Sequence, residues 1–319
     1  MCSSDLDVKA GILSHHLKQR KTLKMLSNTH DLTVCVGDIF CLVMGGRGPI
    51  SQTFFLPTAK SDLFMPHSST EIKLMKKRAA AVYTRDQLTC DNLLITKVPA
   101  FYKGNPMMDR LKATGHRFEI NQSQPVIGIL PGSREEAYAN LDHILKVIGK
   151  IKTEVCSQFI LAKSPTLNLD TLSKLLTQHG WTAESLASSE ETNDIKFTHA
   201  TGQSLILSSQ FTDVLHTSSL IIGLSGTANE QAVHLEKPVI CFKGFGPQST
   251  AQRFQEQQKL LGDHLYFIPD RTPDQVADEI SQQISTLVLN QKPAEKSESS
   301  SEKETAAEAI ITHIIEKLG

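Results

Sequence analysis

Two segments of the sequence combine glycine, hydroxyl and charged side chains directly after an apolar run. Residues 131–136 read Pro-Gly-Ser-Arg-Glu-Glu and follow the apolar residues 126–130. Residues 225–230 read Ser-Gly-Thr-Ala-Asn-Glu and follow the apolar residues 220–224. Each pattern predicts a buried strand, a glycine turn and a helix start. Helix starts bind anions through free N–H groups and the positive end of the helix dipole, so two such turns in one domain indicate a diphosphate site.

Both turns also show the spacing of a reciprocal helix cap. Ser133 precedes Glu136 by three residues, and Thr227 precedes Glu230 by three. In such a cap, the hydroxyl and the carboxylate each accept a hydrogen bond from an otherwise free N–H of the first turn. The sequence therefore predicts two capped helices. The alternative is that both turns are only ordinary helix starts and that Arg134 is a surface ion-pair partner.

Length and composition fit a protein of two domains. The chain has 319 residues, 39% of them hydrophobic, which is enough to form two cores. Its six cysteines show no CxxC or Cys/His ligand spacing, so we expect reduced thiols and no metal. The first residues are polar, and the apolar run 32–44 is interrupted by Asp38 and too short to cross a bilayer. The sequence thus predicts a cytoplasmic protein without a secretory signal.

The charge is distributed unevenly along the chain. Basic residues are in excess over residues 1–120, and acidic residues are in excess over residues 121–319. This asymmetry suggests that the first half meets an anionic partner, such as a phosphorylated acceptor or a membrane surface. The alternative is that the basic runs are solvated helix faces. No aromatic residues alternate with the basic ones, so nucleic acid is not an expected partner.

The first half of the chain alternates strands with helices, a pattern that predicts a parallel sheet. This half starts partway through the strand–helix alternation, because no strand and glycine turn precede its first helix. Either the sequence lacks an N-terminal portion, or a partner chain completes the small sheet, as in a homodimer. The expected strands are residues 31–36, 53–56, 79–83 and 98–102, with a basic amphipathic helix over 9–30 and a helix over 86–95.

The second half repeats this alternation and predicts a doubly wound domain. Residues 291–304 are rich in Lys, Glu and Ser and predict a flexible linker. Predicted strands lie at 126–130, 158–162, 195–197, 220–224, 238–242 and 264–268, and predicted helices at 135–152, 170–179, 211–217 and 228–235, with a further one capped by Thr272 and Gln275. The expected domains are 1–115 and 122–290, followed by the linker 291–304 and a terminal helix over 305–319.

Several short motifs follow one another along the chain, namely Gly37-Asp38 and the residues 59–62, 83–86, 104–109, 130–135, 226–231 and 246–248. In this order they resemble the motifs of the proteins related to lipid-A-disaccharide synthase. This family is a branch of the glycosyltransferases with two facing Rossmann-like domains, the GT-B fold. The resemblance runs from about residue 8 to residue 288, although family members carry further N-terminal strands and a glycine-rich loop, so the first domain is incomplete by comparison.

The resemblance implies an α/β protein that transfers a sugar from a UDP-sugar, such as UDP-N-acetylglucosamine, to a lipid-linked acceptor, peripheral to a membrane and without metal or cofactor. It implies that Glu230 contacts the ribose. The ribose-binding Glu of the synthase, however, stands one residue further along, at the position of Gln231. A general base for the acceptor is expected at Asp38 or Asp62, unless these residues merely cap turns. The implied diphosphate-binding residues are Gly132, Ser133, Arg134, Gly226, Thr227 and Gln248.

Two other functions remain open at this point. One is a UDP-N-acetylglucosamine 2-epimerase on the same fold. It requires further acidic and histidine residues around the sugar, which the sequence does not reveal. The other is an inactive relative that binds a nucleotide.

Overall fold

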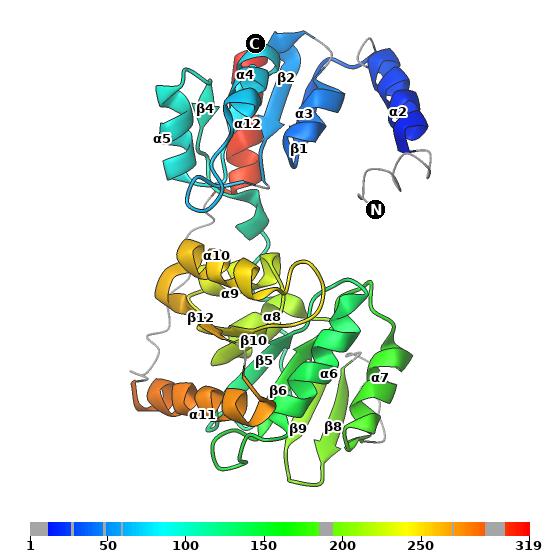
Figure 1. Cartoon of the computed structure of the whole chain (residues 1–319), viewed down its shortest axis with the longest axis vertical. Coiled ribbons are helices and arrows are strands. Elements are labelled where there is room, and N and C mark those ends of the chain that lie inside the picture. Colours follow the sequence, from blue (N-terminus) through cyan, green and yellow to red (C-terminus); the bar gives the residue numbers. More distant parts are fainter. Residues whose placement is uncertain are drawn as a thin grey trace. The chain divides into compact units, whose positions relative to one another are not determined.

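The computed structural model describes residues 12–26, 29–46, 49–58, 60–184, 194–269, 271–290 and 304–319. The chain divides into two compact units (Figure 1). Unit 1 consists of Met1–Asp109 and Ser300–Gly319, and unit 2 consists of Arg110–Ser299. The predicted linker, 291–304, lies outside the described residues except for Glu304.

Unit 1 contains a four-stranded parallel sheet in the order β1-β2-β3-β4. Its apolar strands are short, and each ends at a polar loop on the same edge of the sheet. Apolar residues alternate between the two faces, so that Phe54 and Phe55 are both buried, but in different cores. The strands are β1 (Thr33–Val36), β2 (Thr53–Leu56), β3 (Ala81–Tyr83) and β4 (Ala100–Phe101).

Helices cover both faces of this sheet. On one face, Phe55 packs with Leu42, Met75 and Leu93 of three helices that follow the strands. On the other face lies the C-terminal helix α12 (Ala306–Leu318). The remaining helices are α2 (Ile12–Leu26), α3 (Ile39–Gly45), α4 (Ser69–Arg78) and α5 (Gln87–Ile95), with short 3-10 turns η1 (Ile50–Gln52) and η2 (Pro106–Met108).

Helix α12 is bound to unit 1 at its start and along its length. The Asp109 carboxylate accepts hydrogen bonds from the backbone N–H groups of Ala306, at 2.9 Å, and Ala307, at 2.8 Å. Thr305 and Glu308 form the predicted capping box. Ile310 and Ile314 are buried against β2 and β3. The last helix therefore completes the second face of a sheet that is formed about two hundred residues earlier.

Unit 2 contains an eight-stranded sheet in the order β12-β11-β10-β5-β6-β9-β8-β7. The first six strands in this order are parallel, and β7 and β8 are antiparallel to their neighbours. The strands are β5 (Val126–Leu130), β6 (Gln158–Ala162), β7 (Trp181–Ala183), β8 (Ile195–His199), β9 (Ser204–Ser208), β10 (Leu220–Gly223), β11 (Val239–Phe242) and β12 (Leu265–Ile268).

The antiparallel edge differs from the sequence prediction, which placed only one short strand, 195–197, in this region. The chain reverses between β8 and β9 in a tight turn, in which the Gly202 N–H donates to the His199 carbonyl. So short a connection permits only antiparallel pairing, because a parallel neighbour needs a crossover. Strands β7 and β9 were missed, and β9 contributes to the site described below.

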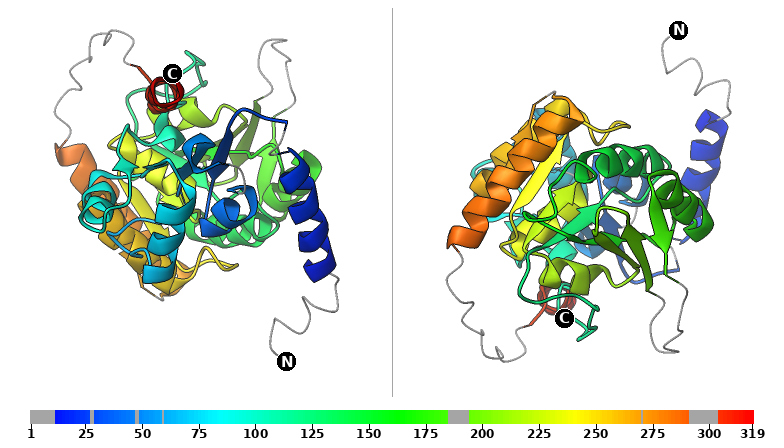
Figure 2. Two further views of the ribbon diagram at one scale, coloured as in Figure 1. Left: turned by 90° about the horizontal axis from the view of Figure 1, so that it is seen from above. Right: turned by 90° about the horizontal axis from the view of Figure 1, so that it is seen from below.

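Helices α6 to α11 accompany this sheet in the described part of unit 2. Helix α11 begins at the predicted cap, where the Gln275 side chain accepts from the Thr272 N–H, and it runs alongside α6 (Figure 2). Helix α10 was missed by the sequence analysis. The helices are α6 (Glu136–Ile148), α7 (Leu169–Gln178), α8 (Phe211–Thr217), α9 (Thr227–His234), α10 (Ala251–Leu261) and α11 (Pro273–Asn290), with the 3-10 turn η3 (Gly262–His264).

The polar stretch before β5 is fixed to unit 2 by one buried carboxylate. Asp213, on α8, accepts hydrogen bonds from the N–H groups of Thr114, at 2.9 Å, Gly115, at 3.1 Å, and His116, at 3.2 Å. Burial alone would raise the pKa of Asp213, but these hydrogen bonds lower it below its usual value. The carboxylate thus stays charged and holds the stretch in place.

None of the described helices combines the length and the apolar character that a membrane crossing requires.

Candidate functional site

A cavity of about 630 Å³ lies in unit 2 at the carboxyl ends of β10, β5, β6 and β9. Ligands of open α/β sheets bind at this edge, and the volume falls in the range of small-molecule sites. The lining comes from the loops after these strands, from the starts of α6, α8 and α9, and from the loop after β11. It comprises Leu130–Arg134, Glu136, Asn140, Ala162–Pro165, Ser209, Phe211, Leu224–Ala228, Gln231, Gln248 and Ser249.

The two glycine turns lie next to each other because their strands are neighbours. Strands β5 and β10 pair with Leu130 opposite Gly223, and the Leu224 N–H donates to the Leu130 carbonyl at 2.9 Å. Gly132 has φ of +114°, a conformation that side chains rarely permit. All six residues of the predicted diphosphate set, Gly132, Ser133, Arg134, Gly226, Thr227 and Gln248, line the one cavity.

The predicted caps of these two helices are wrong. Helix α6 begins after Glu135, and α9 begins after Gly226, and no side chain caps either start. Ser133 lies too early in the chain to cap α6, and Thr227 is already the first residue of α9. In α6 the N–H groups of Ala137 and Tyr138 already donate to the carbonyls of Arg134 and Glu135, so the donors that this turn offers to an anion lie earlier, at residues 133–136. In α9 no cap side chain engages the first turn, which suits it to an external anion.

The predicted ribose contact falls on a neighbouring residue. Glu230 is not part of the cavity lining, whereas Gln231 is. Successive residues of a helix point about 100° apart, so only one of this pair faces the cavity. The ribose-binding role of Glu230 stays a prediction, and Gln231 is the side chain that the structure places at the cavity.

A buried side-chain amide supports the second glycine turn, at residues 225–230. Asn229, which is fully buried, donates to the Gly223 carbonyl at 3.1 Å and accepts from the Ser225 hydroxyl at 3.3 Å. Gln257 of α10 adds a hydrogen bond to the Gly226 carbonyl at 2.8 Å. A Cβ atom on Gly223 would lie only 1.9 Å from Asn229 Oδ1, so glycine is required there. The turn is therefore rigidly supported.

Four further lining residues were missed by the sequence analysis. Lys163 and Ser164 follow β6, and Ser209 and Phe211 follow β9. Lys163 adds a cation, and Phe211 adds an aromatic ring to the cavity. The apolar run before Lys163 was recognised as a strand, but its end was not considered. The run 204–208 was not recognised as a strand at all, so nothing drew attention to the residues after it.

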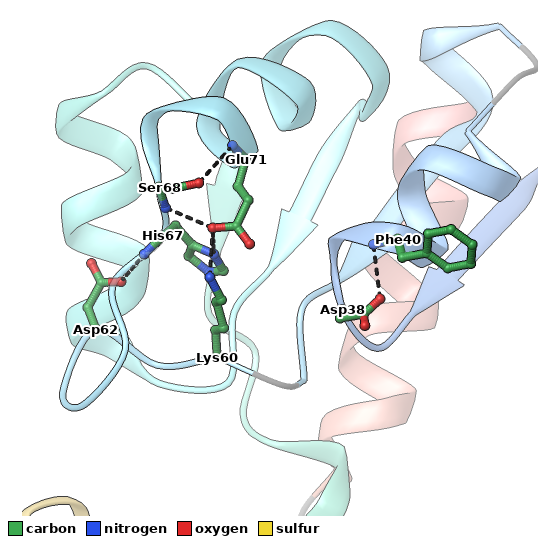
Figure 3. A network of polar contacts seen from close by, with 7 residues as sticks. All are labelled: Asp38, Phe40, Lys60, Asp62, His67, Ser68 and Glu71. Atoms are coloured by element: carbon green, nitrogen blue, oxygen red, sulfur yellow. Dashed lines mark hydrogen bonds and ion pairs between the residues drawn. The ribbon is translucent and has the colours of Figure 1, made fainter. Parts of the chain in front are cut away.

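In unit 1, the predicted base Asp38 caps a helix (Figure 3). Its Oδ1 accepts from the Phe40 N–H at 2.9 Å, and the side chain lies at the exposed start of α3. This is the capping role that the sequence left open as its alternative.

The second candidate, Asp62, belongs to a cluster of charged groups beyond β2 (Figure 3). The Asp62 carboxylate accepts a hydrogen bond from the side-chain amide of Asn92 at 2.8 Å and one from the backbone N–H of His67 at 3.3 Å. Lys60 Nζ lies 2.8 Å from Glu71 Oε2, and the same oxygen accepts from the Ser68 N–H at 2.7 Å in a capping box of α4. The charged and polar groups of this cluster therefore form most of their hydrogen bonds and ion pairs with one another.

His67 is the unusual member of this cluster. Its side chain is 3% exposed, and neither ring nitrogen has a hydrogen-bond partner among the described residues. Burial lowers the pKa of His67 below its usual value, and nearby Lys60 acts in the same direction, although Glu71, Asp62 and Asp86 oppose the shift. His67 is therefore neutral at pH 7. The sequence analysis found no histidine pattern and did not select this residue.

No three His, Cys, Asp or Glu side chains are placed to hold a metal ion in the part of the chain that the structure describes. The five described cysteines are free thiols, and burial raises the pKa of Cys156 to about 11.

Comparison with known proteins gives structural likeness only. No protein-family model and no curated protein sequence matches the chain. Similar solved structures include a protein of Listeria monocytogenes assigned as a UDP-N-acetylglucosamine 2-epimerase, at 14% identity over 86% of this chain and 71% of that chain, with a TM-score of 0.54. The UDP-GlcNAc 2-epimerase of Methanocaldococcus jannaschii is 15% identical over 94% and 80% of the two chains, with a TM-score of 0.52.

A third similar structure is that of S. aureus MnaA solved with UDP, at 16% identity over 95% of this chain and 79% of that chain, with a TM-score of 0.52. At such identities the likeness shows the fold, which is α/β with two Rossmann-like units of the GT-B type, as predicted from the sequence.

The predicted glycosyltransferase function is wrong by the same comparison. The three similar structures described above are UDP-GlcNAc 2-epimerases or a UDP-containing relative in fold, and none is a lipid-A-disaccharide synthase, so they favour the alternative that the sequence left open. The motifs shared with the synthase lie at strand ends that bind nucleotide sugars in general, so they do not separate the two reactions. An epimerase has no acceptor, so it does not need the base that the sequence assigned to activating one. The lipid-linked acceptor, membrane surface and homodimer stay predictions of the sequence.

Proposed function

We propose that the cavity of unit 2 binds a UDP-sugar and that the protein is an enzyme that epimerises this sugar at C2, as a UDP-N-acetylglucosamine 2-epimerase does. The observation that carries the proposal is the pair of uncapped helix starts, α6 and α9, at one cavity that also contains Arg134 and Lys163. The structural neighbours that act on UDP-GlcNAc or contain UDP support the choice of nucleotide.

The diphosphate is assigned to the two glycine turns. A diphosphate needs several N–H donors and positive charge within a few ångströms, and two helix starts on adjacent strands provide both. Arg134 adds a planar fork of donors that fits two phosphate oxygens, and Lys163 adds a point charge from the next strand. Ser133 and Thr227 contribute hydroxyl donors.

The remaining lining fits the rest of a nucleotide sugar. The Phe211 ring offers a stacking surface for a base. Gln231 and Gln248 carry amides that both donate to and accept from hydroxyl groups. Glu136 is the acidic member of the lining and accepts only, which suits a sugar hydroxyl and does not suit a phosphate. The cavity therefore provides separate partners for the base, the hydroxyls and the phosphates.

Epimerisation at C2 breaks the C–H bond on one face of the sugar and forms a new C–H bond on the other, so it needs a base that removes the proton and a donor that delivers one to the opposite face. The sequence named Asp38 and Asp62, and we propose Asp62 as the better candidate of the two. Asp38 is exposed and occupied as a helix cap, whereas Asp62 lies beside Lys60, His67 and Glu71. This cluster brings together, within unit 1, acidic and histidine side chains of the kind that such a reaction requires.

The test follows proton exchange at C2. Purified protein is incubated with UDP-GlcNAc in D₂O, and the C2 proton signal is followed by NMR. We expect loss of this signal with appearance of the C2 epimer, and we expect Asp62→Asn to abolish both while UDP binding measured by calorimetry is retained. Binding of UDP without exchange at C2 would contradict the proposed reaction, and no binding of UDP would contradict the proposed site.

A further inference from the structure

One buried side chain connects two of the loops around the cavity. Asn140 of α6 is 1% exposed. Its Nδ2 donates to the Pro131 carbonyl at 3.1 Å, in the turn after β5. Its Oδ1 accepts from the Phe245 N–H at 2.6 Å, in the loop after β11. A single amide therefore fixes the position of two loops that come from strands on opposite sides of β10.

Ser249 extends this connection to the third loop. It is 1% exposed, and its hydroxyl donates to the Leu224 carbonyl at 2.8 Å, immediately before the second glycine turn. Asn140 Nδ2 also approaches Ser249 Oγ, at 3.4 Å. An unbroken chain of hydrogen bonds thus runs from Pro131 through Asn140 and Ser249 to Leu224 and links the two glycine turns.

The backbone around these side chains is packed to accommodate them. A Cβ atom on Gly244 would lie 2.5 Å from Asn140 Oδ1 and 3.0 Å from Ser249 Cβ, so a larger residue at 244 would displace the amide. The Gly244 N–H donates to the Ser249 carbonyl at 2.8 Å and closes the loop. Because the network is buried and its hydrogen bonds are satisfied, it holds the loops in one arrangement.

We propose that Asn140 and Ser249 are positioning residues that set the spacing of the two diphosphate-binding turns, an inference that rests on the proposed UDP site. Neither residue needs to contact the phosphates. They fix the turns before the ligand arrives, so that binding does not require the loops to be ordered. The consequence is specific to ligands that touch both turns at once, namely diphosphates rather than monophosphates.

The experiment measures the affinities of UDP and UMP by calorimetry for the full-length chain and its variants. Asn140→Leu leaves the Pro131 carbonyl and the Phe245 N–H without their partner, and we expect UDP affinity to fall by about tenfold or more. UMP affinity is expected to fall less, so that the preference for UDP over UMP decreases. Ser249→Ala is expected to act in the same direction with a smaller change, and Ser249→Thr, which keeps the hydroxyl, to restore the preference.

Gln203 provides a matched control. It is also a buried amide of unit 2, at 1% exposed, and its Nε2 donates to the carbonyls of Ile148, at 3.2 Å, and Ile151, at 3.0 Å. It is absent from the cavity lining. Gln203→Leu is therefore expected to lower the melting temperature as Asn140→Leu does, while leaving both nucleotide affinities unchanged.

The outcomes separate the two proposals. No binding of UDP by the wild type overturns the proposed site and this inference with it. Binding by the wild type with an unchanged UDP-to-UMP preference in the variants overturns only the positioning role. If Asn140→Leu does not fold, Asn140→Asp, which keeps the acceptor for Phe245 and loses the donor to Pro131, and Ser249→Ala give the same decision.

Discussion

The carboxyl ends of the parallel strands in the two units differ in whether side chains cap the helices that follow them. In unit 2, α6 and α9 begin without a side-chain cap and line a cavity. In unit 1, α3 is capped by Asp38 and α4 by a box of Ser68 and Glu71. The turns before α6 and α9 thus direct backbone donors at a cavity, whereas side chains cap the starts of α3 and α4.

This difference shows how to tell a binding edge from a structural one. A capped start has already used its first N–H groups, so its polar residues contribute to folding stability. An uncapped start needs a partner from outside the helix. Substitutions at the unit 2 edge should therefore change ligand affinity, and those at the unit 1 caps should change stability alone.

The largest expected effect is on UDP affinity in unit 2. Arg134→Ala removes a charged hydrogen-bond donor from the proposed diphosphate site, which costs about 1.5–3 kcal/mol, or roughly tenfold to a hundredfold in Kd. Arg253→Ala is the control, since Arg253 pairs with Glu256 on α10 and is absent from the cavity lining. Calorimetry with UDP checks both, and equal affinities for the two variants would contradict the assignment of Arg134.

The next effect is on the stability of unit 2. Gly223→Ala forces a Cβ atom against Asn229, and we expect the unfolding free energy to fall by about 1–3 kcal/mol. Gly226→Ala is the control, because a Cβ atom there meets nothing within 4 Å. Urea unfolding followed by fluorescence reports on unit 2 alone, since Trp181 is the one tryptophan in the sequence and is buried there. Similar midpoints for both variants would show that the turn is less rigid than described.

A smaller effect is expected at the capped helix of unit 1. Ser68→Ala removes the capping box of α4 and should destabilise unit 1 by about 1 kcal/mol. Ser68→Asp retains a capping oxygen and serves as the control. Hydrogen exchange in α4 measures the change, and UDP affinity should be the same in both variants. A change in UDP affinity would mean that the α4 cap also takes part in nucleotide binding.

A smaller effect is expected on how the stability of unit 1 depends on pH. The pKa of His67 is lowered on folding, mainly by burial, so the unfolded chain binds more protons below about pH 6.5. The stability of unit 1 should therefore be constant above this pH and decrease as the pH falls through 6.5 towards the lowered pKa. His67→Leu should remove this decrease, as measured by urea unfolding followed by circular dichroism at pH 7.5 and 5.5. The same slope in both proteins would exclude His67 as its source.

The smallest effect is expected at Asp38. Asparagine caps a helix about as well as aspartate, so Asp38→Asn should change the unfolding free energy by less than about 0.5 kcal/mol. UDP affinity and exchange at C2 should also be unchanged. Loss of exchange in this variant, with normal stability, would instead identify Asp38 as the group that moves the proton.

Local sequence patterns predicted most strands and helices of both sheets. Apolar runs such as 126–130 and 220–224 are long and bounded by glycine, and capping boxes such as Thr305 with Glu308 are contained within four residues. The two glycine turns were found in the same way, and their meeting follows from the pairing of parallel strands. The α/β class and the meeting of the two glycine turns at one edge of a sheet could therefore be predicted without coordinates, whereas the binding of a diphosphate there stays a prediction.

The remaining features depend on contacts between residues far apart in the chain. The sequence placed caps on α6 and α9, but where each helix begins is decided by the turn packed on Asn140 or Asn229. Lys163 and Phe211 enter the cavity because β6 and β9 lie beside β5, and His67 meets Glu71 and Asp62 through the fold of one loop. The sequence by itself determined which segments form strands, turns and helices, because those preferences are local. Only the tertiary structure decided which distant loops meet at the cavity and where α6 and α9 begin, because both depend on how the turns pack against residues far apart in the chain.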